Sequence, residues 1–222
     1  MYNPSLWEYL IQYYKHKGQE LGKVSNEFLT AVKKRRSIYA ISKEAILSDE
    51  QIEALVGEAV LNTPSAFNSQ SARVIVLLNE QHDKLWNLTE ETLKQIVPAD
   101  SFEATAQRIA AFRSGYGSVL FFEDQSVIEG LQEQFASYKD NFPLWSLHSS
   151  GMLQFVVWTA LEAEGYGASL QHYSPLIDEQ VAKEWDVPST WKLIAQLPFG
   201  KVTAPAGEKT FQPLDSRLKV FK

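Results

Sequence analysis

The spacing of hydrophobic and polar residues predicts helices and strands that alternate along the chain. Apolar residues recur at helical spacing over about residues 25–34, 48–63, 85–97, 101–115, 127–138, 152–161 and 181–185. Short apolar runs predict strands at residues 74–78, 118–122, 168–173 and 191–197, with a strand-like piece at 218–221. Helical and extended segments are therefore interleaved.

A run of small and amide residues, 62–73, separates one predicted helix from the strand that follows it. Ser48 and Gln51 form a capping-box pattern at the start of that helix. Pro64 disfavours helical backbone at Thr63, so the helix should stop there. The run is therefore predicted to be a helix-to-strand corner with short side chains, which a flat ligand could approach closely.

Two amides in this run, Asn68 and Gln70, each carry a donor and an acceptor in one plane. This pattern suits the edge of a heteroaromatic ring that displays alternating carbonyl and N–H groups. The alternative is that both amides only stabilise their own loop, because Asn and Ser are common turn residues.

Four cations followed by a serine, residues 33–37, close the first predicted helix. Cations at a helix C-terminus complement the helix dipole, which is one interpretation. The other is that Arg35 and Ser37 bind a phosphate, because Arg offers a planar fork of donors and Ser a hydroxyl. Both interpretations stay open on these residues alone.

The most apolar predicted helix, residues 152–161, carries hydrophobic side chains on every face. A helix of this kind is buried, either inside the fold or across a subunit interface.

Composition indicates a single large core and few types of partner. Of 222 residues, 45% are hydrophobic and 12% aromatic, which is ample for one domain. The net charge of −6 gives no electrostatic footprint for nucleic acid or an anionic membrane, so we expect neither partner. The absence of cysteine excludes disulfides, thiolate nucleophiles and thiol metal ligands.

Residues 1–24 differ from the rest of the chain by their crowding of aromatic side chains. We interpret them as a leader or arm of uncertain origin and assign the domain to residues 25–222. No apolar stretch is long enough to span a bilayer and no secretory signal pattern is present, so a cytoplasmic location is expected.

Several common types of catalytic site are disfavoured by spacing. The histidines show no paired metal-ligand spacing, so no metal site is expected. Residues 165–167 are a fragment of a dinucleotide fingerprint, but they follow a helix and the third glycine is missing. Ser149 or Ser150 with His148 or His172 leaves a weak serine-hydrolase alternative, which predicts a colourless protein.

Three motifs, in this order, resemble the FMN-dependent nitroreductase family. They are R-R-S at residues 35–37, P-S-x-x-N-S-Q at 64–70 and G-x-G-A-x-L-Q-H at 165–172. Each motif alone is weak, but the ordered set is specific, and the match extends from about Phe28 to the C-terminus. The stretches at 141–146, 170–173 and 205–211 are similar to a compact branch that includes the yeast fatty-acid-repression nitroreductase-like proteins.

This resemblance implies an α+β fold with a central, largely antiparallel sheet flanked by helices. It also implies a homodimer with FMN at the interface and a C-terminal tail that reaches the partner. The residues that it assigns to FMN binding are Arg35, Arg36, Ser37, Asn68, Gln70, Ser71, Gln171, His172, Lys209 and Arg217.

The roles of these residues also follow from the resemblance. Arg35 and Ser37 would bind the phosphate and ribityl chain, and Asn68 the pyrimidine edge of the flavin. Gln171 and His172 would place backbone N–H groups near the reactive flavin nitrogen. A late cation, Lys209 or secondly Arg217, would complete the phosphate site. Candidates for contacts to the partner's cofactor are Trp145, Ser149 and Ser150.

The activity implied by the resemblance is ping-pong reduction of nitroaromatic or quinone acceptors, with NADH or NADPH as hydride donor and no catalytic protein side chain. The alternative is a non-catalytic flavin-binding or regulatory protein whose stacking face is blocked. In relatives a variable middle region helps to line the acceptor site, and five residues here match that region. Core packing explains the phenylalanines among them at least as well. The five residues are Phe112, Arg113, Tyr116, Phe121 and Phe122.

Overall fold

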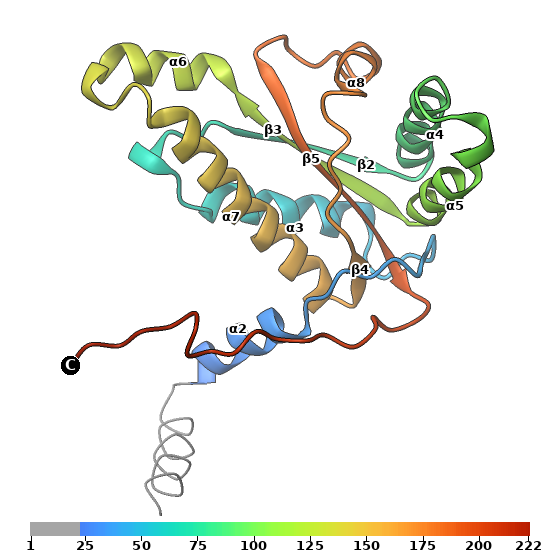
Figure 1. Ribbon diagram of the computed structural model, residues 1–222, viewed down its shortest axis with the longest axis horizontal. Helices are drawn as coiled ribbons and strands as arrows, with labels where there is room; N and C mark the ends of the chain where they lie inside the picture. The colour runs from blue at the N-terminus through green and yellow to red at the C-terminus, as the bar shows by residue number, and fades with distance from the viewer. Residues whose placement is uncertain (1–22) are drawn as a thin grey trace, which may run out of the picture.

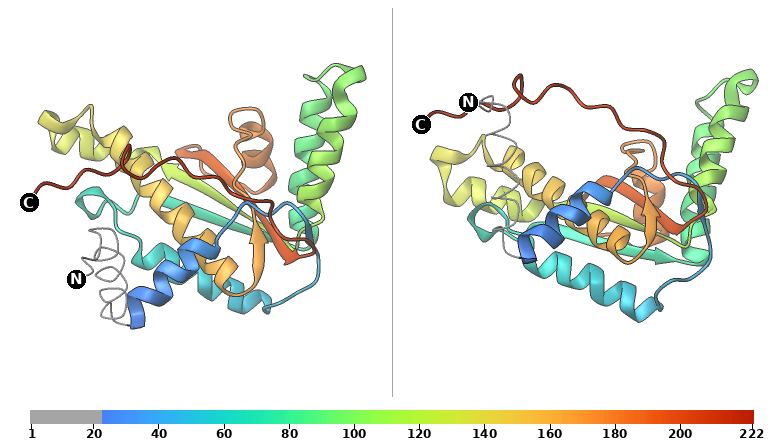
Figure 2. Two further views of the ribbon diagram at one scale, coloured as in Figure 1. Left: turned by 60° about the horizontal axis from the view of Figure 1, so that its bottom comes forward. Right: turned by 90° about the horizontal axis from the view of Figure 1, so that it is seen from below.

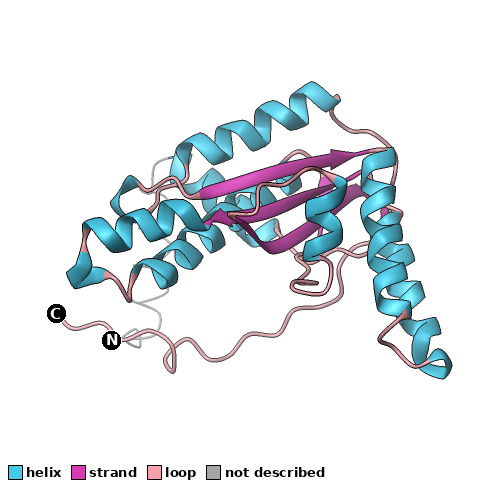
Figure 3. Ribbon diagram, turned by 90° about the horizontal axis from the view of Figure 1, so that it is seen from above, coloured by secondary structure: helices cyan, strands magenta, loops and turns pink. Residues whose placement is uncertain are grey.

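The computed structural model describes residues 23–222, which form an open antiparallel sheet covered by helices on both faces (Figures 1 and 3). The sheet order is β1-β5-β3-β2, and β4 pairs with β5 beside this path. The strands are β1 (Ile41–Ser42), β2 (Ala72–Leu78), β3 (Gly117–Asp124), β4 (Tyr166–Ala168) and β5 (Trp191–Val202). The predicted α+β class with an antiparallel sheet flanked by helices is confirmed.

The helices lie between the strands along the chain, as the alternation of patterns predicted. They are α2 (Lys23–Lys34), α3 (Asp49–Asn62), α4 (Glu80–Lys94), α5 (Phe102–Arg113), α6 (Gln125–Gln134), α7 (Phe142–Ala163) and α8 (Asp178–Glu184). Short 3-10 turns lie at η1 (Ala66–Asn68), η2 (Ala99–Ser101) and η3 (Ala136–Tyr138).

The central strand β3 is buried along its whole length because helices cover both of its faces. Val119 and Phe121 point to one face and pack in a core with residues of α3 and α7. Leu120 and Phe122 point to the other face and pack with residues of α4, α5 and α8. This alternation follows from the two-residue period of a strand.

The corner between α3 and β2 forms as the sequence predicted. Ser48 and Gln51 make both hydrogen bonds of the capping box, and the Thr63 N–H donates to the Ala59 carbonyl at the end of α3. Pro64 follows, and β2 begins at Ala72.

Several predicted boundaries are wrong. The apolar helix begins at Phe142 rather than Met152, because Pro143 is tolerated in the first turn of a helix. Strand β5 continues through Pro198 to Val202. A strand lacks only one donor at a proline, and the Pro198 carbonyl still accepts from the Ser169 N–H at 3.3 Å.

Other extended segments also differ from the prediction. Strand β4 ends at Ala168, and beyond it only Gln171 makes an isolated bridge, with Gln196. Residues 218–221 form no strand and are exposed. Helix α2 begins at Lys23, two residues before the predicted start at residue 25.

After β5 the chain runs as an extended tail (Figures 1 and 2). The Thr203 N–H donates to the Ala40 carbonyl at 2.9 Å, and a side-chain nitrogen of Arg36 donates to the Gly207 carbonyl at 2.6 Å. The predicted leader, residues 1–24, lies almost entirely outside the described residues. Among residues 23–222, no helix combines the length and hydropathy needed to cross a membrane.

Candidate functional site

The R-R-S segment packs against the C-terminal half of α7. The guanidinium of Arg35 lies over the Trp158 ring, with its Cζ atom 4.3 Å from the ring centroid. The Trp158 indole N–H donates to one carboxylate oxygen of Glu162 at 2.9 Å, and the Arg36 backbone N–H donates to the other at 2.8 Å. Arg35 is thus held by stacking, while its buried Nε has no hydrogen-bond partner among the described residues.

The pKa of the Glu162 carboxyl lies above its ordinary value. Burial raises the pKa of Glu162 to about 6, against the lowering effects of the two hydrogen bonds and of the Arg35 and Arg36 charges. Above that pH the carboxylate carries a full charge beside both guanidinium groups, which fixes their positions electrostatically.

Arg36 and Ser37 face different parts of the fold. Arg36 holds the C-terminal tail through the Gly207 carbonyl. Ser37 makes a parallel bridge with Ala168, and the neighbouring Ile38 N–H donates to the Ala168 carbonyl at 2.9 Å. The R-R-S segment therefore lies beside β4, where the third motif begins.

Gly167 makes this close approach possible. A Cβ atom at this position would come within 2.7 Å of the Ile38 Cγ2 atom and 2.9 Å of the Val202 Cγ2 atom. A side chain here would push the R-R-S segment away from β4.

The segment after β4 alternates between bonded and free backbone amides. The N–H groups of Gln171 and Tyr173 donate to the Gln196 carbonyl (2.7 Å) and to its side-chain oxygen (2.8 Å). The intervening His172 amide has no partner among the described residues, and its side chain is exposed. Of the two predicted N–H donors, His172 has the amide that is free for a ligand, whereas the amide of Gln171 is used by the sheet.

The amide loop has an unusual backbone. Phe67, Asn68 and Gln70 all have positive φ (56°, 51° and 50°), a conformation that residues other than glycine rarely adopt. The Gln70 N–H donates to the Ser65 hydroxyl at 2.9 Å, and the Gln70 side chain donates to the Asn68 carbonyl at 3.4 Å. The side-chain amide of Asn68 is exposed and makes no hydrogen bond within the described chain. The loop-stabilising alternative therefore fits Gln70 but not Asn68.

Ser71 is the one predicted loop residue that the structure buries. It is 1% exposed, and its hydroxyl donates to a carboxylate oxygen of Glu123 at 2.6 Å. This hydroxyl therefore connects the loop to β3 and does not face solvent. Glu123 was not singled out by the sequence analysis, although a charged residue on the same strand face as Val119 and Phe121 is a visible signal.

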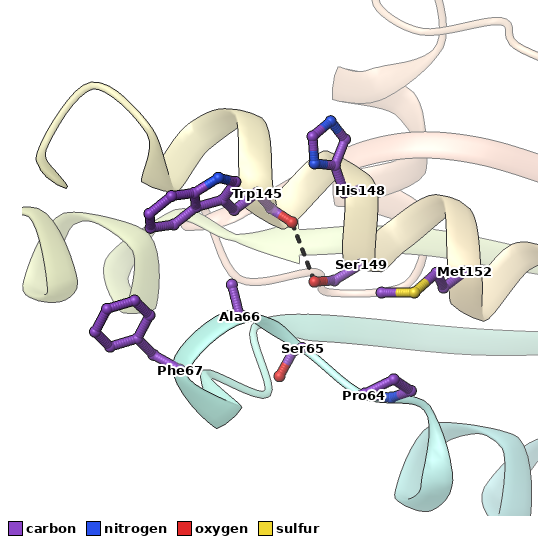
Figure 4. A pocket seen from close by; sticks show the side chains of 8 residues that line it. All are labelled: Pro64, Ser65, Ala66, Phe67, Trp145, His148, Ser149 and Met152. Carbon is purple, nitrogen blue, oxygen red and sulfur yellow. Dashed lines mark hydrogen bonds between the residues drawn. The ribbon is translucent and has the colours of Figure 1, made fainter. Parts of the chain in front are cut away.

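A cavity of about 470 Å³ lies between the amide loop and the N-terminal half of α7. Its lining is mostly apolar: Pro64, Ser65, Ala66, Phe67, Trp145, His148, Ser149 and Met152 (Figure 4). Its size falls in the range of pockets for small organic molecules. The rings of Phe67 and Trp145 stack at one end, with centroids 6.0 Å apart and planes inclined by 18°.

The serine-hydrolase alternative finds no support in this cavity. The Ser149 hydroxyl donates to the Trp145 carbonyl at 3.1 Å, and the buried Ser150 hydroxyl accepts from the Gln154 side chain at 3.0 Å. Neither hydroxyl is hydrogen-bonded to a histidine of the described residues. Within residues 23–222, no group of three or more metal-ligating side chains is placed to hold a metal ion.

The two groups of predicted cofactor residues lie at opposite ends of α7. Arg35 contacts Trp158 near one end, whereas Phe67 of the amide loop stacks on Trp145 near the other. Thirteen residues of helix at 1.5 Å per residue separate these contacts by about 20 Å. One chain therefore places Arg35, Ser37 and His172 on segments that neighbour one another around β4, whereas Asn68 lies at the other end of α7.

The tail cations and the middle region differ from the expected site. Lys209 lies 5.1 Å from the Phe211 ring on the exposed tail, and Arg217 is exposed further along it. The middle-region residues named above were expected to line an acceptor site. Of these, Phe112, Phe121 and Phe122 are at most 2% exposed. Core packing explains these three phenylalanines. Arg113 and Tyr116 instead contact Glu90 and Asp49.

Residues 32–201 match the sequence profile described as the Nitroreductase family. The chain belongs to this family, whose members are flavin-dependent oxidoreductases.

Two yeast proteins and one bacterial protein illustrate the similarity. The putative nitroreductase HBN1 of Saccharomyces cerevisiae is 37% identical over 83% of this chain and 92% of its own. Nitroreductase FRM2 of the same yeast is 33% identical over 84% of this chain and 94% of its own. Nitroreductase CinD of Lactococcus lactis, solved in complex with nicotinic acid, is 47% identical with a TM-score of 0.82, over 88% of this chain and all of that one. CinD in complex with 4-nitrophenol aligns with a TM-score of 0.81 at 46% identity over the same shares.

Proposed function

We propose that this protein is an NAD(P)H-dependent FMN nitroreductase and quinone reductase that works as a homodimer. The observation that carries the proposal is the group along β4. There a stacked guanidinium with a buried, unpaired Nε, an exposed serine side chain and a free backbone amide lie on neighbouring segments. This donor set suits a ligand with a phosphate at one end and hydrogen-bond acceptors at the other.

FMN fits these donors by its chemistry. Arg35 and Ser37 would hold its phosphate and ribityl chain, and the His172 amide would face its ring system. When bound, FMN would supply the redox chemistry, taking a hydride from NADH or NADPH and passing two electrons to the acceptor in a second half-reaction. Lys209 and Arg217 remain candidates for the phosphate site, because the tail that carries them passes Arg36.

The separation of the two residue groups supports a dimeric site. Since about 20 Å of α7 lies between Arg35 and Asn68 in one chain, a cofactor that touches both needs residues from two chains. Residues on α2, α3 and α7 also leave apolar side chains exposed: Phe28, Leu29, Leu61, Leu144, Leu147, Met152 and Val156. The tail adds Phe211, Leu214, Leu218, Val220 and Phe221. Large exposed apolar surface of this kind is typical of a protein interface.

In this dimer the cavity beside Trp145 would bind the acceptor. Its apolar walls and stacked aromatic rings suit a flat, electron-poor ring, and CinD holds nicotinic acid and 4-nitrophenol. The reaction in this scheme requires no protein acid or base, because solvent can supply the protons. A cytoplasmic location is part of the proposal, because NADH and NADPH are supplied there.

The test is an absorbance spectrum of the purified protein, followed by anaerobic additions of NADH or NADPH and then 4-nitrophenol. We expect a yellow protein that bleaches with the nucleotide and recovers its colour with the acceptor. Retained FMN that never bleaches would favour the non-catalytic flavin-binding alternative. A colourless protein that does not bind added FMN would refute the proposal. Sedimentation of the protein as a monomer would refute the dimer.

A further inference from the structure

The amide loop is held in its positive-φ conformation by contacts with the neighbouring strands. The guanidinium of Arg73 donates to the Gln70 carbonyl at 2.7 Å and to the Asp124 carboxylate at 3.0 Å. The Ser71 carbonyl accepts from the Asp124 N–H at 2.9 Å. Backbone strain of this kind persists only where the surroundings over-determine it. The loop conformation therefore depends on its attachment to the end of β3.

Glu123 is the buried part of this attachment. Its side chain is 1% exposed, one carboxyl oxygen accepts from the Ser71 hydroxyl at 2.6 Å, and the other oxygen is buried without a partner. A buried carboxylate without a cation partner is unfavourable, so an unpaired oxygen at this position needs a physical explanation.

The charged groups around Glu123 are few. Arg73 lies on β2 but pairs with Phe122, whose side chain points to the other face of the sheet. Asp124 is the next residue of β3, and Lys192 is the backbone partner of Glu123 on β5. Lys192 is exposed, and Arg73 is already bonded to Asp124 and to the Gln70 carbonyl. No cation among residues 23–222 is therefore bonded to Glu123.

We propose that Glu123 is a positioning residue that acts through Ser71 to hold the loop carrying Asn68. Its neutral form fixes that loop, and its ionised form loosens it. In the neutral form Glu123 can stay buried with the Ser71 hydroxyl as its only partner among the described residues. In the ionised form the carboxylate has no cation bonded to it within residues 23–222, because Arg73 pairs with Phe122 and bonds to Asp124 on the other face of the sheet. Opening of the loop, which exposes the carboxylate to water, is then favoured. The loop is then less firmly held.

The titration falls in the physiological range. Burial raises the pKa of Glu123 to about 7, against the lowering effects of the Ser71 hydrogen bond and the Arg73 charge. The loop should accordingly be fixed below pH 7 and loosened above it. The effect on cofactor binding rests on the proposed function, but the effect on the loop does not.

The loop is tested by hydrogen exchange of a peptide spanning residues 64–72, in the wild-type protein and in Glu123→Gln at pH 6 and pH 8. The isosteric Gln cannot ionise, so comparing the two proteins at one pH cancels the intrinsic pH dependence of exchange. We expect equal exchange at pH 6 and exchange at least about threefold faster in the wild type at pH 8, within the roughly tenfold per pH unit that one proton allows. Equal exchange at both pH values would overturn the proposal.

Two further variants sharpen the test. Ser71→Ala removes the connection and should speed exchange in the loop at both pH values, and unchanged exchange would overturn the role of Ser71. Glu90→Gln removes one negative charge on α4, where Glu90 pairs with Arg113, and should keep the wild-type difference between pH 6 and pH 8. Loss of that difference in Glu90→Gln would assign it to net charge and overturn the role of Glu123.

The dissociation constant of FMN, from quenching of its fluorescence, gives the functional measurement. We expect it to rise through pH 7 in the wild type and to stay flat in Glu123→Gln. If FMN binds with the same pH step in both proteins, this inference fails while the proposed function stands. If FMN binds neither protein, the proposed function fails, and the exchange experiment alone decides the role of Glu123.

Discussion

Arg35 offers the sharpest test of the cofactor site, because its two expected roles affect different observables. In the structure its guanidinium stacks on Trp158 at 4.3 Å and has an unpaired Nε. The stacking should stabilise the fold, whereas the remaining donors should bind a phosphate. Arg35→Ala removes both contributions, so the affinity for FMN and the free energy of unfolding should fall independently.

The magnitudes follow from the kind of contact. A hydrogen bond to a charged group contributes about 1.5–3 kcal/mol, so the dissociation constant of FMN should rise roughly 10- to 150-fold. The lost cation–π contact should lower the free energy of unfolding of the apoprotein by about 0.5–2 kcal/mol. Arg35→Lys keeps the charge but loses the planar fork, so its FMN affinity should lie between those of the wild type and the alanine variant.

Lys34→Ala is the matched control, because Lys34 is exposed at the end of α2, directly before Arg35, and carries the same charge. FMN titration by fluorescence quenching and urea denaturation of the apoprotein measure the two effects. An FMN affinity within twofold of wild type in Arg35→Ala would refute the phosphate role. Equal weakening by Lys34→Ala would show that general electrostatics, not a placed guanidinium, binds the cofactor.

Three further outcomes are expected. Trp145→Ala removes the ring that stacks on Phe67 and should raise the KM for 4-nitrophenol about 2- to 12-fold in steady-state assays; an unchanged KM would exclude this ring from the acceptor site. Leu161→Ala empties a fully buried core position and should cost about 2–5 kcal/mol in urea denaturation, whereas the exposed Ile96→Ala should cost under about 0.5 kcal/mol. The raised pKa of Glu162, about 6, means that its neutral form favours folding: this contribution is complete below the unfolded pKa near 4.5 and is lost as pH rises through 6. Unfolding free energies at pH 4 and pH 7.5 should therefore fall with rising pH by about 1–2 kcal/mol more in the wild type than in Glu162→Gln, and parallel changes would contradict this assignment.

Local signals in the sequence were enough to place the elements around the site. The capping box at Ser48 and Gln51 and the proline at position 64 define α3 and its end through contacts within a few residues. The β-branched run of β2 and the motif order placed the amide loop correctly between them. These features depend on neighbouring residues, so they can be read along the chain.

Features set by pairing between distant segments could not be predicted in this way. Strand β1 has only two residues, Ile41 and Ser42, and exists because Val202 and Lys201 pair with them. The extension of β5 beyond Pro198 likewise depends on partners in β3 and β4. The buried partnership of Ser71 with Glu123, 52 residues away, depends on the register of β2 and β3.

The distribution of the site over two chains leads to a last prediction. Arg35 and Asn68 lie near opposite ends of α7, and in a two-fold dimer each cofactor would meet Arg35 of one chain and Asn68 of the other. Arg35→Ala and Asn68→Ala should each impair both sites of their own homodimer. If the two variants are denatured and refolded together, each mixed dimer places both substitutions in one site and leaves the other site intact. Random assortment makes half of the dimers mixed, so the mixture should recover about a quarter of the wild-type high-affinity FMN sites. A mixture that binds no more FMN than the separate variants would mean that both residues act within one chain, or that one of them does not contact the cofactor.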